Sequence, residues 1–175
     1  MILRSWREED RAPFAAMNAD PKVMEFFQSE LTARESDSLV DRILGHFATH
    51  GFGLFALERR SDAAFLGFTG FYSCPPDTPV AGEIEIGWRL AREHWRRGYA
   101  YEAASACIDW FWDHTAHQRL VSFTSTHNLP SQKLMRKLGL EHRSDLDFDH
   151  PAIPSDDPLC HQVVFVIDRG GDLRD

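Results

Sequence analysis

The sequence predicts an α/β (mixed α+β) fold in which mostly antiparallel strands surround a central β-α-β unit. Apolar residues recur at helical spacing in several segments, while shorter alternating or β-branched segments predict about six to seven strands. No repeat, linker or low-complexity tract divides the 175 residues, and 43% of them are hydrophobic. A chain of this size can bury roughly two-thirds of its unfolded surface. We therefore expect a single domain over residues 1–175.

The first fifty residues are expected to form one strand and three helices. The strand covers residues 2–6, an amphipathic helix covers residues 8–18, and a short helix runs from Asp20 to about residue 27. Thr32 followed by Glu35 is a capping box, which predicts the start of a longer helix. Gly51 marks the end of that helix, because glycine readily adopts the left-handed conformation of a helix C-terminus.

The middle of the chain reads as two antiparallel strands and then a strand followed by a helix. Residues 54–58 and 65–72 form the antiparallel pair, with a turn at Ser61-Asp62. Residues 74–79 form a loop, because its prolines prevent regular hydrogen bonding. A strand over residues 83–88 then leads to a long helix that ends near residue 114.

The C-terminal part is predicted to hold three further strands and one helix. Residues 120–126 are β-branched and strand-like. Asn128 caps a helix with Pro130 in its first turn, and Gly139 ends it. Residues 141–149 and 163–167 are expected to be the last two strands, on either side of a loop rich in proline and aspartate.

The segment from Glu83 to Ala103 suggests a binding site for phosphate. A strand leads through a short polar turn to Arg96, Arg97 and Gly98, and an alanine-rich helix follows directly. Unpaired N–H groups at a helix N-terminus and the helix dipole both favour an anion. The alternative is an ordinary strand-to-helix connection with two solvated arginines.

Two motifs in this chain resemble those of the GNAT acetyltransferases, and in particular the branch that includes the ribosomal-protein N-acetyltransferases. The pyrophosphate loop of that family reads Gln/Arg-x-x-Gly-x-Gly/Ala, and Gly98 and Ala100 match its last two fixed positions. Trp95 departs from the first. Downstream, residues 128–140 resemble the Asn-x-x-Ser/Ala…Lys-Leu-Gly-Phe end of the same cofactor site. Two motifs in the right order are more specific than either alone.

The resemblance covers nearly the whole chain and implies a GNAT-like fold that binds acetyl-CoA as co-substrate. The pyrophosphate would lie on the backbone amides of the turn and the helix start, and the pantetheine would follow the strand end at Trp88 and Leu90. The residues that the resemblance assigns to acetyl-CoA binding are Trp88, Leu90, Arg96, Arg97, Gly98, Tyr99, Ala100, Tyr101, Asn128 and Ser131.

Glu83 and Glu85 are the candidates for the catalytic base. They lie two residues apart in a strand, so period-two alternation places both carboxylates on one face. On pattern alone this could be a solvated sheet face. In the family the equivalent strand often supplies a Glu that takes a proton from the attacking amine, and partial burial would raise its pKa toward neutrality. The sequence does not choose between the two, because a β-bulge would change the phase.

Ser131 is the candidate for contacting the thioester sulfur. Asn128 and Ser131 also have an ordinary structural explanation, as helix cap and first-turn residue. Many family members carry a tyrosine four residues after the Ser/Ala position, as acid for the departing thiolate. Here that position is Met135, which cannot donate a proton.

Metal binding is not expected. Asp145, Asp147 and Asp149 alternate but do not fit a calcium loop, and the His46/His50 pair lacks the glutamate of a metalloprotease motif. The aspartates are read as a solvated strand edge, or alternatively as a negative rim that attracts a cationic acceptor.

Composition excludes several partners. The net charge of −8 argues against nucleic acid, and no apolar run is long enough to cross a membrane. The start of the chain has no signal region, and the three cysteines are scattered. We therefore expect a cytoplasmic protein, monomeric or homodimeric.

The favoured function is acetyl-CoA-dependent transfer of an acetyl group to a primary amine, in a protein N-terminus or a small molecule. The alternative is a non-catalytic acyl-CoA-binding or regulatory module on the same fold, because the tyrosine is missing. Residues 20–50 and 145–158 are expected to shape the choice of acceptor, but fold does not determine specificity.

Overall fold

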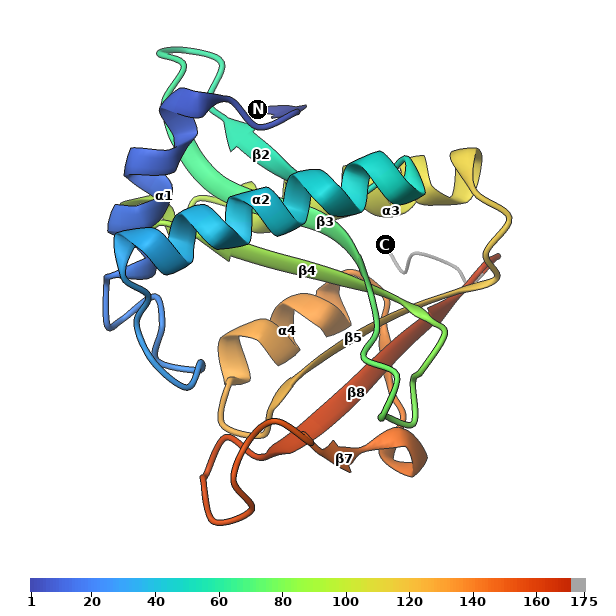
Figure 1. Cartoon of the computed structure of the whole chain (residues 1–175). Helices are drawn as coiled ribbons and strands as arrows, with labels where there is room; N and C mark the ends of the chain where they lie inside the picture. The colour runs from blue at the N-terminus through green and yellow to red at the C-terminus, as the bar shows by residue number, and fades with distance from the viewer. Residues whose placement is uncertain (171–175) are drawn as a thin grey trace. The chain divides into compact units, whose positions relative to one another are not determined.

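The computed structural model describes residues 1–170 and confirms the predicted fold class (Figure 1). These residues form an eight-stranded, mostly antiparallel sheet in the order β1-β2-β3-β4-β5-β8-β6, and β7 also pairs with β8. The strands are β1 Ile2–Arg4, β2 Leu54–Glu58, β3 Phe65–Ser73, β4 Ile84–Leu90, β5 Arg119–Ser125, β6 Glu141–His142, β7 Phe148–Asp149 and β8 His161–Asp168. The helices are α1 Arg11–Asn18, α2 Ala33–His50, α3 Tyr99–His114 and α4 Leu129–Lys137, with 3₁₀ turns η1 Glu8–Asp10, η2 Arg92–His94 and η3 Ser144–Leu146.

The chain divides into two compact units. The first unit holds residues 1–72 and 87–107, and the second holds residues 73–86 and those from 108 onward. Three elements continue from one unit into the other. Strand β3 passes from the first unit to the second between Tyr72 and Ser73. Strand β4 passes from the second unit to the first between Ile86 and Gly87, and helix α3 passes from the first to the second after Cys107.

In the first unit, α1 and α2 cover one face of β2 and β3. Their apolar side chains form one core cluster, which includes Phe14, Val40, Ile43, Ala56 and Phe68. The start of α2 confirms the predicted capping box. The Thr32 side chain accepts from the N–H of Glu35, and the Glu35 carboxylate accepts from the N–H of Thr32. Gly51 ends α2 at φ +75°, as the sequence predicted.

The short helix predicted from Asp20 to about residue 27 is wrong. Residues 21–29 form turns and bends instead. The Met24 N–H donates to the Asp20 carbonyl, which closes one helical turn, and the Phe27 N–H then donates to the Met24 carbonyl. A single turn is not extended because helix nucleation is costly and brief helices are marginal without strong packing.

In the second unit, β5 lies between β4 and β8. It pairs with β8 antiparallel over all seven of its residues, and with β4 parallel at Ile84–Leu120 and Glu85–Val121. The parallel pair joined through α3 is the predicted β-α-β unit. The N-cap of α4 is also confirmed, because the Asn128 side chain accepts from the N–H of Ser131.

The prediction of a single strand over residues 141–149 is wrong. The chain pairs with β8 at residues 141–142, departs from it, and pairs with it again at residues 148–149. Five residues, 143–147, lie opposite only Val163 and Val164. The Asp147 carboxylate accepts the N–H of Val164 at 2.8 Å, in place of a backbone carbonyl, while the Arg143 N–H donates to the Val164 carbonyl. This excursion turns one predicted strand into β6 and β7 and explains the eighth strand.

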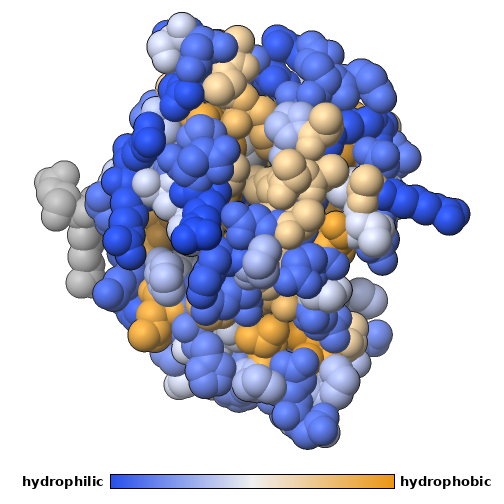
Figure 2. Space-filling view, turned by 90° about the vertical axis from the view of Figure 1, so that its left-hand side faces the viewer, coloured by the Kyte–Doolittle hydropathy of each residue, from blue (hydrophilic) through white to orange (hydrophobic). Residues whose placement is uncertain are grey.

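Most of the surface drawn in Figure 2 is hydrophilic, with smaller apolar areas between the polar side chains. No helix within residues 1–170 is long and apolar enough to cross a membrane.

Candidate active site

The turn between β4 and α3 has an unusual backbone that leaves space beside Gly98. Gly98 has φ +83°, and Arg96 has φ +57°, which is uncommon for a residue with a side chain. A Cβ atom placed on Gly98 would meet no protein atom within 4 Å. The space beside this glycine is therefore open to a ligand, while the turn itself requires a left-handed conformation.

The start of α3 presents backbone donors at this turn. The first helical bond runs from the Glu102 N–H to the Gly98 carbonyl. The N–H groups of Gly98, Tyr99 and Ala100 have no acceptor among residues 1–170. Arg96 and Arg97 are exposed beside them. Unpaired donors, the positive end of a helix dipole and two guanidinium groups together suit a phosphate group.

Trp95, the departure from the family pattern, supports the turn. Its indole Nε1 donates to the Leu90 carbonyl at 2.8 Å, so the side chain ties the turn back to the end of β4. A glutamine or arginine at this position would carry a polar group at the end of a short or flexible aliphatic stem, whereas tryptophan adds a large apolar surface.

Four of the predicted cofactor residues pack together in the first unit. Trp88, Tyr99 and Ala100 contact a cluster of buried residues that includes Leu90, and Leu57 and Leu66 of β2 and β3 belong to the same cluster. The end of β4 and the start of α3 are thereby held against the sheet. Tyr101, the last of the predicted cofactor residues in this segment, is 37% exposed.

The structure distinguishes Glu85 from Glu83, which the sequence did not. Both belong to the second unit. The Glu83 carboxylate lies 3.9 Å from Arg119, so it faces a cation. The Glu85 carboxylate has no hydrogen-bonding partner or counter-ion in the described part of the chain, and burial raises its pKa from 4.5 to about 8. Glu85 as a residue is only partly buried, but the protein atoms packed around its carboxylate displace enough water to disfavour the charged form.

Asn128 and Ser131 lie together at the start of α4 in the second unit. The Asn128 side chain accepts from the Ser131 N–H at 3.2 Å and donates to the Thr124 hydroxyl at 3.0 Å. The structural explanation of Asn128 is therefore confirmed. The Ser131 hydroxyl, in contrast, has no partner within residues 1–170, and the residue is partly exposed. Met135 is 1% exposed and belongs to the core.

Sequence reasoning missed Arg89, between Trp88 and Leu90. Its guanidinium is largely buried, and burial lowers its pKa to about 10. Nη1 donates to the Oδ1 atom of Asn18, which is completely buried. The available signal was a charged residue between the apolar residues Trp88 and Leu90 of one strand, because charged residues are rarely buried without a partner.

The acidic and histidine-rich segments contain no candidate metal centre among the residues that the structure describes. No group of three potential ligands occurs within residues 1–170. Asp145, Asp147 and Asp149 do not share one strand edge, contrary to the sequence prediction. Each has a local partner: Arg143 for Asp145, His142 for Asp147 and His161 for Asp149.

A model of the GNAT acetyltransferase domain matches residues 1–141. The chain belongs to the GNAT family. Among its relatives, the uncharacterized N-acetyltransferase YjdG of Bacillus subtilis is 35% identical over 98 residues, covering 55% of this chain and 56% of YjdG. The residues that the family model matches include the loop at Gly98.

Solved structures confirm the GNAT fold. An acetyltransferase from Agrobacterium tumefaciens has a TM-score of 0.76 and 24% identity, covering 95% of this chain and 90% of its own. A ribosomal-protein-alanine N-acetyltransferase from Brucella melitensis has a TM-score of 0.73 and 13% identity, with 96% and 99% coverage. A spermidine N-acetyltransferase from Vibrio cholerae, solved with CoA and spermine, has a TM-score of 0.75 and 14% identity, with 97% and 96% coverage.

Proposed function

We propose that this GNAT chain is an N-acetyltransferase that moves an acetyl group from acetyl-CoA to a primary amine, with residues 1–175 acting as one domain. The observation that supports it most is the turn at Gly98, where open space adjoins unpaired backbone N–H groups. The continuity of β4 and α3 through both units supports a single domain. The structure of the Vibrio cholerae relative with CoA supports the choice of co-substrate.

The residues around Gly98 fit the pyrophosphate of acetyl-CoA. The N–H groups of Gly98, Tyr99 and Ala100 would donate to phosphate oxygens, and Arg96 and Arg97 would add charge. Trp88 and Leu90 would contact the pantetheine, with Tyr101 and Asn128 near the bound molecule. When bound, acetyl-CoA supplies an activated thioester carbonyl.

Glu85 is the proposed base. The neutral amine of the acceptor attacks the thioester carbonyl, and Glu85 takes the proton that the nitrogen loses, directly or through water. Its raised pKa matches this role, because a base is most effective when its pKa lies near the working pH. Glu83 is the weaker candidate, since its carboxylate lies 3.9 Å from the guanidinium of Arg119.

Ser131 is proposed to donate its hydroxyl hydrogen bond to the departing thiolate of CoA. Its hydroxyl is unpaired in the described chain, so no existing bond has to break. Met135 occupies the position of the family tyrosine and cannot replace it.

We also place the protein in the cytoplasm. Cys74, Cys107 and Cys160 are all free and buried, as expected for a reducing compartment. Burial raises the pKa of Cys74 and of Cys107 to about 12, so neither is poised to react.

The test is to replace Gly98 and measure CoA binding by calorimetry. Gly98→Leu fills the open space beside the unpaired N–H groups, so the affinity for CoA should fall at least about 100-fold. Gly51→Leu is the matched control, because Gly51 has a similar φ of +75° and equally open surroundings. Circular dichroism should give the same helix content for both variants. Tight CoA binding by a folded Gly98→Leu variant would refute the proposed pyrophosphate site at Gly98.

A second candidate function is a non-catalytic acyl-CoA-binding module, which the burial of Met135 at the tyrosine position favours. Release of free CoA thiol, measured with a panel of amines and peptides, separates the two. No turnover with any acceptor, together with micromolar CoA binding, would favour the module.

A further inference from the structure

Arg89 lies among residues of the first unit that do not neutralise it. Its guanidinium carbon is 4.0 Å from the centre of the Phe27 ring and 5.5 Å from that of Phe68. Nη1 donates to Asn18 at 2.6 Å. Asn18 is itself fixed, because its amide nitrogen donates to the buried Ser36 hydroxyl at 2.9 Å. The side chain is thus held in place by two aromatic rings and one amide.

The remaining donors of Arg89 have no acceptor. Among residues 1–170, Nε is buried without a hydrogen-bonding partner, and no carboxylate lies within ion-pair distance. Nη2 also has no acceptor in that part of the chain, but it is not among the buried unpaired atoms, so it reaches solvent. A shielded cation with one neutral hydrogen bond is costly, since buried charges are normally paired.

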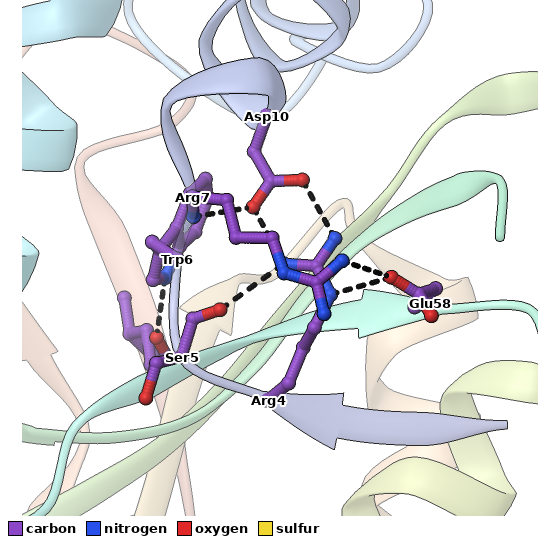
Figure 3. A network of polar contacts seen from close by, with 7 residues as sticks. Arg4, Ser5, Trp6, Arg7, Asp10 and Glu58 are labelled. Atoms are coloured by element: carbon purple, nitrogen blue, oxygen red, sulfur yellow. Dashed lines mark hydrogen bonds and ion pairs between the residues drawn. The ribbon is translucent and has the colours of Figure 1, made fainter.

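Two other shielded arginines, Arg4 and Arg169, have acceptors for several of their donors. Arg4 binds the carboxylates of both Asp10 and Glu58 (Figure 3). Arg169, which is also partly buried, donates to three backbone carbonyls. Arg89 therefore makes one hydrogen bond, whereas Arg169 makes three.

The unpaired edge of Arg89 has the shape that matches a carboxylate. Nε and Nη2 lie on the same side of a guanidinium and can donate two parallel bonds. This chain uses that edge repeatedly, in Arg59 with Asp62, Arg119 with Asp168 and Arg143 with Asp145. In Arg89 the same edge is unpaired and accessible from its Nη2 end.

We propose that Arg89 binds a carboxylate of the acceptor, so that the preferred substrates are amines that also carry a carboxylate, such as amino acids and their analogues. This inference rests on the proposed acetyltransferase function. Phe27, which is 42% exposed, stacks on the guanidinium and covers it. Full pairing at Nε requires residues 20–32 to shift, and no helix or strand holds them. A polyamine, with cationic groups only, is a poor substrate because Arg89 repels it.

The test compares acceptors that differ only in the carboxylate. A panel of free amino acids is assayed beside the corresponding amino acid amides, by release of CoA thiol. The wild type should prefer the acid of the best pair by at least about tenfold in kcat/KM, as expected for a charge-assisted bond. Arg89→Gln should remove this preference and leave the KM for acetyl-CoA unchanged. Arg89→Lys keeps the positive charge but loses the planar pair of guanidinium donors, so this variant should retain part of the preference for acids.

The control for lost charge is Arg34→Gln, because Arg34 is exposed on α2 of the same unit. It should keep the wild-type preference. Equal rates for acids and amides in the wild type would overturn the proposal, and so would an unchanged preference in a folded Arg89→Gln variant. The first comparison needs no variant, so it holds even if Arg89→Gln does not fold.

A separate binding measurement distinguishes this proposal from the proposed function. Benzoate and benzamide are titrated into the wild type and into Arg89→Gln without acetyl-CoA, and binding is followed by calorimetry. Benzoate should bind the wild type at least about tenfold more tightly than benzamide does, and the difference should vanish in the variant. If no amine is turned over but this difference is found, the function fails and the carboxylate site stands. If the wild type does not distinguish the two compounds, the site is refuted.

Discussion

Glu85 and Glu83 have opposite surroundings although they lie two residues apart. Glu83 faces Arg119, whereas Glu85 has no counter-ion in residues 1–170, and burial raises the pKa of Glu85 to about 8. Below that pH the carboxyl of Glu85 is mostly protonated and cannot accept a proton. The rate should therefore rise with pH as the carboxyl ionises.

This sets the expected pH dependence. With an acceptor whose amine has a pKa well below 6, kcat/KM of the wild type should rise up to about pH 8 and then level off. Glu85→Gln should lose this rise and be slower by about 10²–10⁴-fold. Glu83→Gln is the control and should keep the rise. A rise that survives in Glu85→Gln would assign it to another group.

At this scale the sequence could predict the candidate residues but not their roles. Alternation places Glu83 and Glu85 on one face of the strand. Their surroundings differ because Arg119, more than thirty positions later in the chain, lies beside Glu83. Arg89 was missed for a related reason. Its neighbours Asn18, Phe27 and Phe68 come from distant parts of the chain, so no local pattern reveals that its guanidinium lacks a carboxylate.

Elements with strong local signals were predicted well. The capping box of α2, the glycine that ends it and the Asn128 cap of α4 all depend on residues within a few positions of one another. The two errors have other causes. Residues 20–27 form one helical turn that is not extended into a helix. The excursion at residues 143–147 depends on the hydrogen bond from the Val164 N–H to the Asp147 carboxylate, between residues 17 positions apart.

Gly67 is the glycine that lets β3 lie close to the end of β4. It has φ +137°, and a Cβ there would overlap the Arg89 carbonyl and lie 2.7 Å from the Leu90 Cα. Gly67→Ala should lower the free energy of unfolding by about 3 kcal/mol, through backbone strain and overpacking. Urea denaturation measures the change.

The control for this prediction is Gly45→Ala. Gly45 lies inside α2, and a Cβ there would meet no atom within 4 Å. This change should raise the unfolding free energy by about 0.5–1 kcal/mol, because alanine favours a helix. Equal stability of the two variants would contradict the role given to Gly67.

At the scale of the whole molecule, long-range ion pairs tie the start of the chain to the sheet. Arg4 of β1 binds Asp10 at 2.6 Å and Glu58 of β2 at 2.7 Å (Figure 3). Burial alone would raise the pKa of Asp10, but hydrogen bonds from Arg4 and from the Arg7 N–H hold it below its ordinary value. Asp10 is 2% exposed, so loss of Arg4 would leave a buried charge unpaired.

Arg4→Met should therefore destabilise the protein by about 3 kcal/mol near neutral pH. Because the pKa of Asp10 is lowered by folding, its contribution is present above the ordinary value of 3.8 and is lost as pH falls through the lower folded value. The gap between wild type and variant should narrow on acidification below about pH 4. A gap independent of pH would show that Arg4 acts through packing alone. Urea unfolding over a pH series measures it.

The alternation of β4 has an evolutionary consequence. Trp88 and Leu90 pack with Leu57 and Leu66, while Arg89 between them contacts Asn18 and Phe68, so consecutive positions serve different sets of neighbours. On the roles proposed for these residues, substitution at position 89 would change the choice of acceptor and leave the pantetheine contacts of Trp88 and Leu90 in place. Insertion or deletion of one residue would instead exchange both sets at once. Among relatives of this chain, new acceptor preferences should thus arise by point substitution within β4.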